Sequence, residues 1–134
     1  MAALTPAQSE YLMSHTQGVF GTGKRDGSPQ LSTINYRFDG EHIWISATKD
    51  RAKFVNAMRN RKVALLVPDN GRQVIVYGTA EGITERLERN RLTRFLREVG
   101  PAPSPADEGE LDRQLESEGR IVIKVTPDRA FDRL

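Results

Sequence analysis

The sequence predicts a mainly β fold with flanking helices (α+β), in which about six antiparallel strands close into a small barrel. Short apolar runs alternate with turn sequences, and two of these turns, Asp39-Gly40 and Pro68 to Gly71, join consecutive strands into hairpins. Sheets built from such hairpins often close into barrels, because closure removes the exposed strand edges. The 134 residues amount to one domain, residues 1–134, and contain no internal repeat.

Six segments have the composition of strands, because β-branched and other apolar residues dominate them. They are residues 19–24, 31–38, 43–46, 63–67, 73–81 and 121–125. The last strand is expected to end at Thr126-Pro127, since proline cannot donate a ladder hydrogen bond. Gly78 indicates a barrel corner, or otherwise a bulge or a close backbone approach. Trp44 alternates with two isoleucines and is expected to face away from them, in the core or in a subunit interface.

Four segments have helical patterns. They are residues 5–16, a short segment around Phe54 and Met58, residues 84–99 and residues 107–118. The first begins with a capping box of Thr5 and Gln8, with Pro6 in its first turn. Asp50 is placed to cap the second. The third is highly charged, and the apolar residues available to its buried side are Leu87, Leu92, Phe95, Leu96 and Val99.

Composition excludes several kinds of site. Lys and Arg number 20 against 18 Asp and Glu, for a net charge of +2, and no basic patch or stripe suggests a nucleic-acid partner. The absence of cysteine excludes thiolate ligands and cysteine nucleophiles, and the two histidines, His15 and His42, are not at metal-ligand spacing. We expect each histidine at the surface or capping a helix. The composition favours a small anionic ligand, with no metal and no nucleic acid.

Two further expectations concern location and assembly. No apolar stretch approaches the ~20 residues that span a membrane, and the N-terminus lacks the pattern of a signal peptide, so we expect a cytoplasmic protein. The hydrophobic fraction of 37% supplies a modest core for this length. A partner subunit would cover additional apolar surface.

The segment from Ser46 to Lys53 leaves a predicted strand, turns, and enters a predicted helix. A helix N-terminus offers free N–H donors and the positive end of the helix dipole, which suit a phosphate. Arg51 and Lys53 add positive charge, and Ser46 and Thr48 add hydroxyl donors. A solvated loop before a surface helix has the same pattern, so both interpretations stay open on the residues alone.

The strand at 31–38 has two chemically different faces, since residues two apart share a face. One face carries Leu31, Thr33 and Asn35, and the other carries Ser32, Ile34 and Tyr36. Thr33 and Asn35 can offer hydrogen bonds to a heterocycle. Taken by itself, however, the pattern favours an ordinary half-exposed strand.

Six motifs in chain order carry a resemblance to a known family. They are Asp26–Ser32, Tyr36–Asp39, Arg51–Lys53, Arg61–Leu65, Tyr77–Glu81 and Ile121–Arg129. Each is loose alone, but their order and spacing are specific together and extend over nearly the whole chain. The sequence resembles the pyridoxamine-phosphate-oxidase-like split-barrel superfamily, and within it the actinobacterial B-type branch of F420-dependent flavin/deazaflavin oxidoreductases.

The resemblance implies a six-stranded antiparallel split β-barrel of the FMN-binding type, a homodimer with cofactor sites in grooves between the subunits. Ser46, Arg51 and Lys53 match its cofactor-phosphate positions. The strand beside the cofactor ring matches Gln30, Leu31, Ser32, Thr33 and Asn35. The resemblance also implies an oxidoreductase. In such an enzyme reduced coenzyme F420 gives a hydride to an electrophilic small molecule, and no side chain acts as a nucleophile.

Two departures argue against oxidation of vitamin B6. Leu31 and Tyr36 stand where the true oxidases have basic residues, and their C-terminal substrate-phosphate residues have no counterpart here. FMN in place of F420, or a non-enzymatic carrier of either cofactor, are the alternatives. An acidic deazaflavin tail would favour additional basic residues beyond the phosphate, for which Lys49, Arg59, Arg61 and Lys62 are the candidates.

Overall fold

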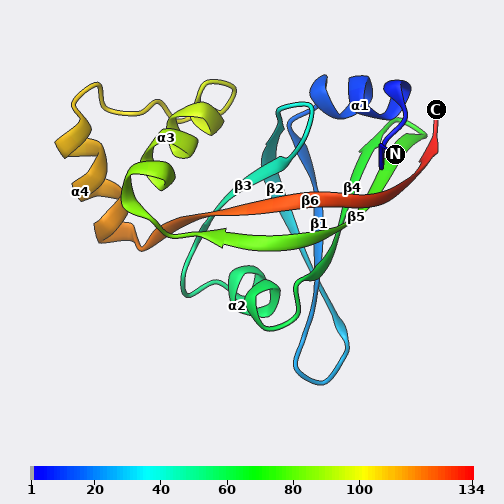
Figure 1. Cartoon of the computed structure of the whole chain (residues 1–134), viewed down its shortest axis with the longest axis horizontal. Helices are drawn as coiled ribbons and strands as arrows, with labels where there is room; N and C mark the ends of the chain where they lie inside the picture. The colour runs from blue at the N-terminus through cyan, green and yellow to red at the C-terminus, as the bar shows by residue number, and fades with distance from the viewer. Residues whose placement is uncertain (1) are drawn as a thin grey trace.

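Six antiparallel strands form a closed barrel in the computed structural model, which describes residues 2–134 (Figure 1). Their order around the barrel is β1-β2-β3-β6-β5-β4. The strands are β1 Gln17–Gly23, β2 Pro29–Phe38, β3 Ile43–Thr48, β4 Lys62–Asp69, β5 Arg72–Ile83 and β6 Arg120–Arg133. The predicted fold class is confirmed.

The predicted hairpins form because their turn residues accept a positive φ. Gly40 has φ 97° between β2 and β3, and the Asp39 carboxylate accepts N–H bonds from Glu41 and His42. Asn70 and Gly71, with φ 48° and 91°, join β4 to β5. The second turn is tighter than predicted, because Pro68 and Asp69 still pair with β5.

The last strand is longer than predicted. It passes through Pro127 and continues to Arg133, so the predicted end at Thr126-Pro127 is wrong. The ladder with β5 shifts register between Tyr77 and Gly78, and this bulge accommodates a proline that has no N–H to donate. Gly78 is needed here, since a Cβ would lie 2.7 Å from the Thr126 carbonyl oxygen.

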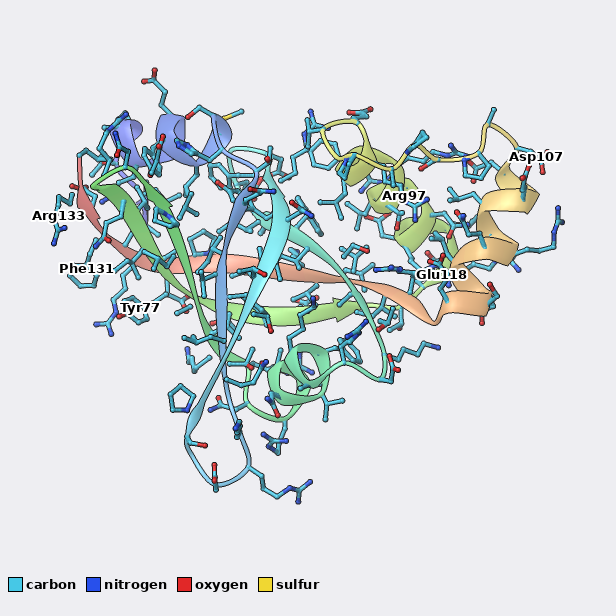
Figure 2. The ribbon with its side chains drawn as sticks, turned by 180° about the vertical axis from the view of Figure 1, so that it is seen from behind. Tyr77, Arg97, Asp107, Glu118, Phe131 and Arg133 are labelled. Atoms are coloured by element: carbon cyan, nitrogen blue, oxygen red, sulfur yellow. The ribbon has the colours of Figure 1, made fainter. Side chains whose placement is uncertain are left out.

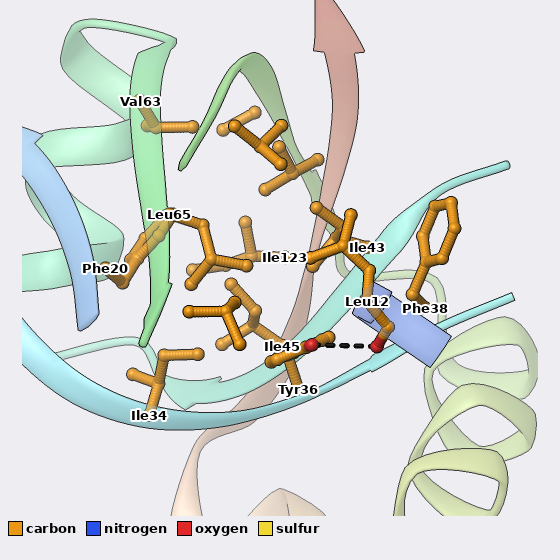
Figure 3. Close-up of a cluster of buried hydrophobic side chains, with 14 of the residues drawn as sticks. Leu12, Phe20, Ile34, Tyr36, Phe38, Ile43, Ile45, Val63, Leu65 and Ile123 are labelled. Atoms are coloured by element: carbon orange, nitrogen blue, oxygen red, sulfur yellow. Dashed lines mark hydrogen bonds between the residues drawn. The ribbon is translucent and has the colours of Figure 1, made fainter. Parts of the chain in front are cut away.

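The barrel interior is filled by apolar side chains from all six strands, and Figure 3 shows part of this core. Helix α1 (Pro6–Met13) closes one end of the barrel, where the Tyr36 hydroxyl donates to the Leu12 carbonyl at 2.8 Å. The predicted capping box of Thr5 and Gln8 is confirmed. Helix α2 (Ala52–Arg59) packs Phe54 and Met58 against the same core.

Helices α3 (Arg86–Arg97) and α4 (Glu108–Glu118) lie outside the barrel, between β5 and β6 in the chain (Figure 1). Trp44 faces away from the barrel interior, as predicted, and packs under α3 in a second apolar cluster with Leu92, Leu96 and Val122. Leu87 and Val99 do not join this cluster and are exposed, so the buried side of α3 is narrower than predicted.

Candidate functional site

Basic side chains gather where β3 turns into α2. Arg51 is the N-cap residue of α2, with no side-chain cap, and Asp50, which we expected to cap the helix, instead accepts a hydrogen bond from the Thr48 hydroxyl at 2.7 Å. The first N–H groups of α2 are therefore without a side-chain acceptor. Arg120, at the start of β6, pairs across the sheet with Thr48.

Lys53 is half-buried within this basic group. Burial is the main cause that lowers its pKa, and the positive charges of Arg51 and Arg120 lower the pKa further. No carboxylate contributes to the shift of Lys53. An anion placed here would relieve the repulsion, which makes the turn a suitable binding site for a phosphate.

A pocket of about 210 Å³, which we call the α3 pocket, lies between the barrel and the end of α3. It brings together Asn35 and Ser46, two of the predicted cofactor residues, from β2 and β3. Arg97 and Arg120 also line it, as do apolar side chains from α3 and the loop that follows. The predicted ring strand and the predicted phosphate segment thus share one cavity.

Sequence reasoning missed Arg97 and Arg120. Arg97 stands in a highly charged helix and Arg120 precedes an apolar strand, so neither has a local signal for a ligand site. What unites them is the pairing of β6 with β3 and the packing of α3 beside β3. Such long-range neighbours cannot be identified from the residues of either segment alone.

The two faces of β2 are arranged as predicted. Leu31, Thr33 and Asn35 are exposed on the outside of the barrel. Thr33 and Asn35 line a second pocket, of about 350 Å³, between β2 and β1. Asn35 therefore stands between this outer pocket and the α3 pocket.

Gln30 and Ser32, also predicted cofactor residues, belong to a different environment. The Gln30 amide donates to the Ser32 hydroxyl at 3.0 Å and accepts from the Thr22 hydroxyl at 3.1 Å. The Thr22 hydroxyl in turn accepts a hydrogen bond from Asn56 on α2. Neither Gln30 nor Ser32 lines the two pockets described above; Gln30 instead joins β2 to β1 through Thr22, and Ser32 contacts Gln30 on its own strand.

The outer face of the sheet is apolar beside Thr33. One row of cross-strand neighbours runs from Thr33 on β2 across to β6, and its other members are Val19, Leu66, Ile75 and Phe131. Phe131 is 55% exposed and packs edge-to-face with Tyr77. Figure 2 shows these two aromatic rings at the opposite end of the molecule from Arg97 and Glu118. We call this surface the outer apolar face.

The basic residues predicted to extend the phosphate site have other contacts. Arg59 donates to the Gly23 carbonyl at 2.8 Å, Arg61 donates to the Ala80 carbonyl at 3.2 Å, and Lys62 lies 3.7 Å from the Asp128 carboxylate. Lys49 donates its backbone N–H to the Gly119 carbonyl, beside α4. Of these four candidates, only Lys49 belongs to the β3–α2 turn, and Arg97 and Arg120 line the adjacent α3 pocket instead.

The histidines have structural contacts, as expected. His15 Nδ1 lies 2.7 Å from the Tyr11 carbonyl at the end of α1, and His42 packs edge-to-face on Trp44. Among residues 2–134, no three His, Asp or Glu side chains gather as a metal site. In the same range, no helix has the length and apolar composition needed to cross a membrane.

Comparisons with known proteins identify the family from the sequence and relate the fold to solved structures. The sequence model of the family described as pyridoxamine 5'-phosphate oxidase matches residues 4–133. A structure named F420 Reductase is 26% identical, with a TM-score of 0.72 over 95% of this chain and 98% of that one. The conserved hypothetical protein Rv2991 from Mycobacterium tuberculosis is 24% identical, with a TM-score of 0.80 over 96% and 84%. General Stress Protein 26 from Bacillus anthracis, 14% identical, has a TM-score of 0.66 over 92% and 88%.

Proposed function

The chain belongs to the pyridoxamine 5'-phosphate oxidase family, and from this membership we propose that it is an F420-dependent oxidoreductase acting on an electrophilic small molecule. When bound, the reduced deazaflavin would supply the hydride, and the protein would supply position and electrostatics. No side chain is required as a nucleophile. We further propose that the working form is a homodimer.

One observation carries the proposal: Lys53 lies among cations at the β3–α2 turn, and Ser46, just before this turn, shares the α3 pocket with Asn35 on the polar face of β2. Arg51 and Lys53 would bind the cofactor phosphate, since both are cationic and Lys53 has only cations as charged neighbours that shift its pKa. Ser46 would add a hydroxyl donor. The exposed side chains of Thr33 and Asn35, with the backbone from Gln30 to Asn35, would lie along the ring system.

The dimer proposal is supported by the outer apolar face. Val19, Leu66 and Ile75 lie on the outside of the barrel, next to the exposed ring of Phe131. Exposed apolar patches of this kind are typical of protein interfaces. Because Thr33 of β2 belongs to the same surface, a partner subunit docked there would also cover the ring-binding strand and complete the groove.

F420 is favoured over FMN by the 26% identity to a structure named F420 Reductase. A deazaflavin carries an acidic tail beyond its phosphate, whereas FMN ends at the phosphate. Of the basic residues predicted to meet this tail, Lys49 belongs to the β3–α2 turn. FMN-dependent oxidation on the same scaffold, and a carrier that binds either cofactor without turnover, remain the alternatives to test.

Titration with both cofactors tests the proposal. We expect F420 to bind more tightly than FMN, with a difference that shrinks as the salt concentration rises, because exposed charges are screened. Equal affinities at low salt would favour FMN or a carrier without preference. A panel of electrophilic acceptors should then oxidise reduced F420 faster with the protein than without it, and binding without acceleration would support the carrier.

A further inference from the structure

We propose that the α3 pocket is a second anion site, where Arg97 and Arg120 bind the carboxylate of a small organic molecule with an apolar body. The assignment of this molecule as the substrate rests on the proposed function. The site adjoins the phosphate site, because Ser46 lines this pocket whereas Arg51 and Lys53 do not.

The charge of the pocket favours an anion. Its lining contains two guanidinium groups and no carboxylate. The acid nearest to Arg120 is Glu118, whose Oε2 lies 3.0 Å from the Arg120 Nε, and both side chains of this pair are partly exposed. Burial is the main cause that lowers the pKa of Arg97, and Arg120 and Arg94 add to it against the opposing effect of Glu118.

The hydrogen-bonding groups of the pocket are largely unused. Arg97 donates from Nη1 to the Gln114 side chain at 3.1 Å, and Arg120 donates from Nε to Glu118. A guanidinium has five N–H donors, so each arginine retains enough of them to bind both oxygens of a carboxylate. Asn35 and Ser46 add an amide and a hydroxyl to the lining of the pocket.

The walls and the size of the pocket limit what accompanies the carboxylate. Leu96, Val99, Pro101 and Ala102 form an apolar side, which inorganic phosphate would leave uncovered. The volume of about 210 Å³ is below the ~300–1,000 Å³ of pockets that hold drug-sized ligands. The occupant is therefore smaller than a flavin, and a compact aromatic or aliphatic acid fits both conditions.

A carboxylate can come from two sources, the substrate or the acidic tail of a deazaflavin. The apolar walls favour the substrate, because a polar tail gains little from contact with Leu96 and Val99. Both sources share the same chemistry at Arg97 and Arg120. They differ in whether the affinity for the cofactor depends on these arginines.

The test measures binding of benzoate and of its neutral analogue benzamide to the cofactor-free protein by NMR titration. We expect benzoate to bind at least tenfold more tightly than benzamide. Arg97→Met should weaken benzoate binding at least tenfold, and Arg120→Gln should weaken it too. Arg113→Met is the matched control, since Arg113 is exposed on α4 and does not line the pocket, and it should change the affinity less than twofold.

Equal binding of benzoate and benzamide, or equal effects of the Arg97 and Arg113 variants, would overturn the proposal. Thermal melting of each variant checks that it folds. If Arg97→Met does not fold, the effect of Arg120→Gln on benzoate binding decides whether the proposal stands.

Cofactor titration of Arg97→Met then separates the sources. Unchanged affinity for both F420 and FMN assigns the carboxylate to the substrate, and a loss for F420 alone assigns it to the tail. A similar loss of affinity for both cofactors would show that the pocket belongs to the phosphate site, and this result would overturn the proposal of a separate anion site. If neither cofactor binds the wild-type protein while benzoate does, the proposed function fails and the carboxylate site stands.

Discussion

Lys53 is the side chain whose surroundings most clearly predict a ligand, because it is half-buried among cations at the start of α2. We expect Lys53→Ala and Arg51→Ala each to weaken cofactor binding by about 1–3 kcal/mol if their charged hydrogen bonds to the phosphate are direct. Fluorescence titration measures the change. Lys49→Ala is the control, since we assign it no contact, and equal losses in all three variants would indicate a general electrostatic effect.

The pKa of Lys53 also links the site to stability. Burial and the neighbouring arginines lower this pKa in the folded protein, so the unfolded chain binds more protons between the folded value and the ordinary lysine pKa of 10.5. The free energy of unfolding therefore rises with pH through that window. Lys53→Gln should reduce this rise and should stabilise the cofactor-free protein at neutral pH, by about 0.2–0.5 kcal/mol for each like-charge contact removed.

Urea unfolding between pH 7 and pH 9.5 measures this effect, with Lys49→Gln as the control. The upper limit stays below the ordinary tyrosine pKa of 10.0, because burial raises the pKa of Tyr36 in the folded protein and ionisation of Tyr36 in the unfolded chain would lower the stability at higher pH. A wild-type protein whose stability does not rise with pH, or a Lys53→Gln variant that is less stable at pH 7, would show that Lys53 is compensated in the absence of ligand.

The individual residues of the site were predictable only where they lie close together in the sequence. Ser46, Arg51 and Lys53 lie within eight residues, and their turn-to-helix pattern was enough to predict a phosphate site there, although a solvated loop has the same pattern. Arg97 and Arg120 come from segments that meet only after α3 has packed on β3. Gln30 and Ser32 have the polarity of ligands, but the barrel uses both side chains in contacts of its own.

Among the elements, α3 and α4 depend most on a single residue. The buried side chain of Arg89 on α3 donates to Asp112 and to Glu116 on α4, both at 2.8 Å, and Asn90 also donates to Asp112. Asp112 and Glu116 both keep some contact with solvent, which limits the cost of leaving them unpaired. Arg89 therefore acts chiefly by joining the two helices.

We expect Arg89→Ala to lower the free energy of unfolding by about 1–3 kcal/mol, since it removes several charged hydrogen bonds of a buried side chain. Denaturant unfolding monitored by circular dichroism measures the loss. Arg91→Ala, which removes an exposed i,i+3 pair with Glu88 on the same helix, should cost less than about 1 kcal/mol. Similar losses in the two variants would mean that the buried network adds nothing beyond a surface pair.

Turn residues predicted that the strands and helices exist better than they predicted the residues at which these elements begin and end. Gly40 and Gly71 define hairpins through their backbone freedom alone, and the sequence identifies both. The end of β6 was missed because Pro127 forbids one hydrogen bond, while the bulge opposite Gly78 removes the need for that bond. The cap of α2 was missed because Asp50 has a nearer partner in the Thr48 hydroxyl.

The molecule as a whole presents an apolar surface that is uncovered in a single chain. We expect the wild-type protein to sediment at about twice its chain mass at micromolar concentration, because association would bury Leu66, Ile75 and Phe131. Phe131→Asp should shift the mass toward one chain and weaken cofactor binding with it. Leu87→Asp is the matched control, since Leu87 is 68% exposed on α3 and lies outside the outer apolar face. A wild-type monomer that binds cofactor tightly would remove the groove between subunits from the proposal.

The bulge on β6 decides which side chains that surface can contain. In the first half of the strand the odd-numbered residues Ile121, Ile123 and Val125 point into the barrel, whereas beyond the bulge it is Ala130 that packs on the core. Between Val122 and Arg133, Asp128 is the one residue that has no partner in the ladder with β5. Inward-facing residues are therefore odd-numbered before it and even-numbered after it. If Asp128 were paired in a regular ladder with no bulge, strict alternation would turn the ring of Phe131 toward the interior and Ala130 toward the outside. One unpaired aspartate thus determines which side chains of β6 belong to the outer apolar face. It does so without any need to contact a partner that binds this face.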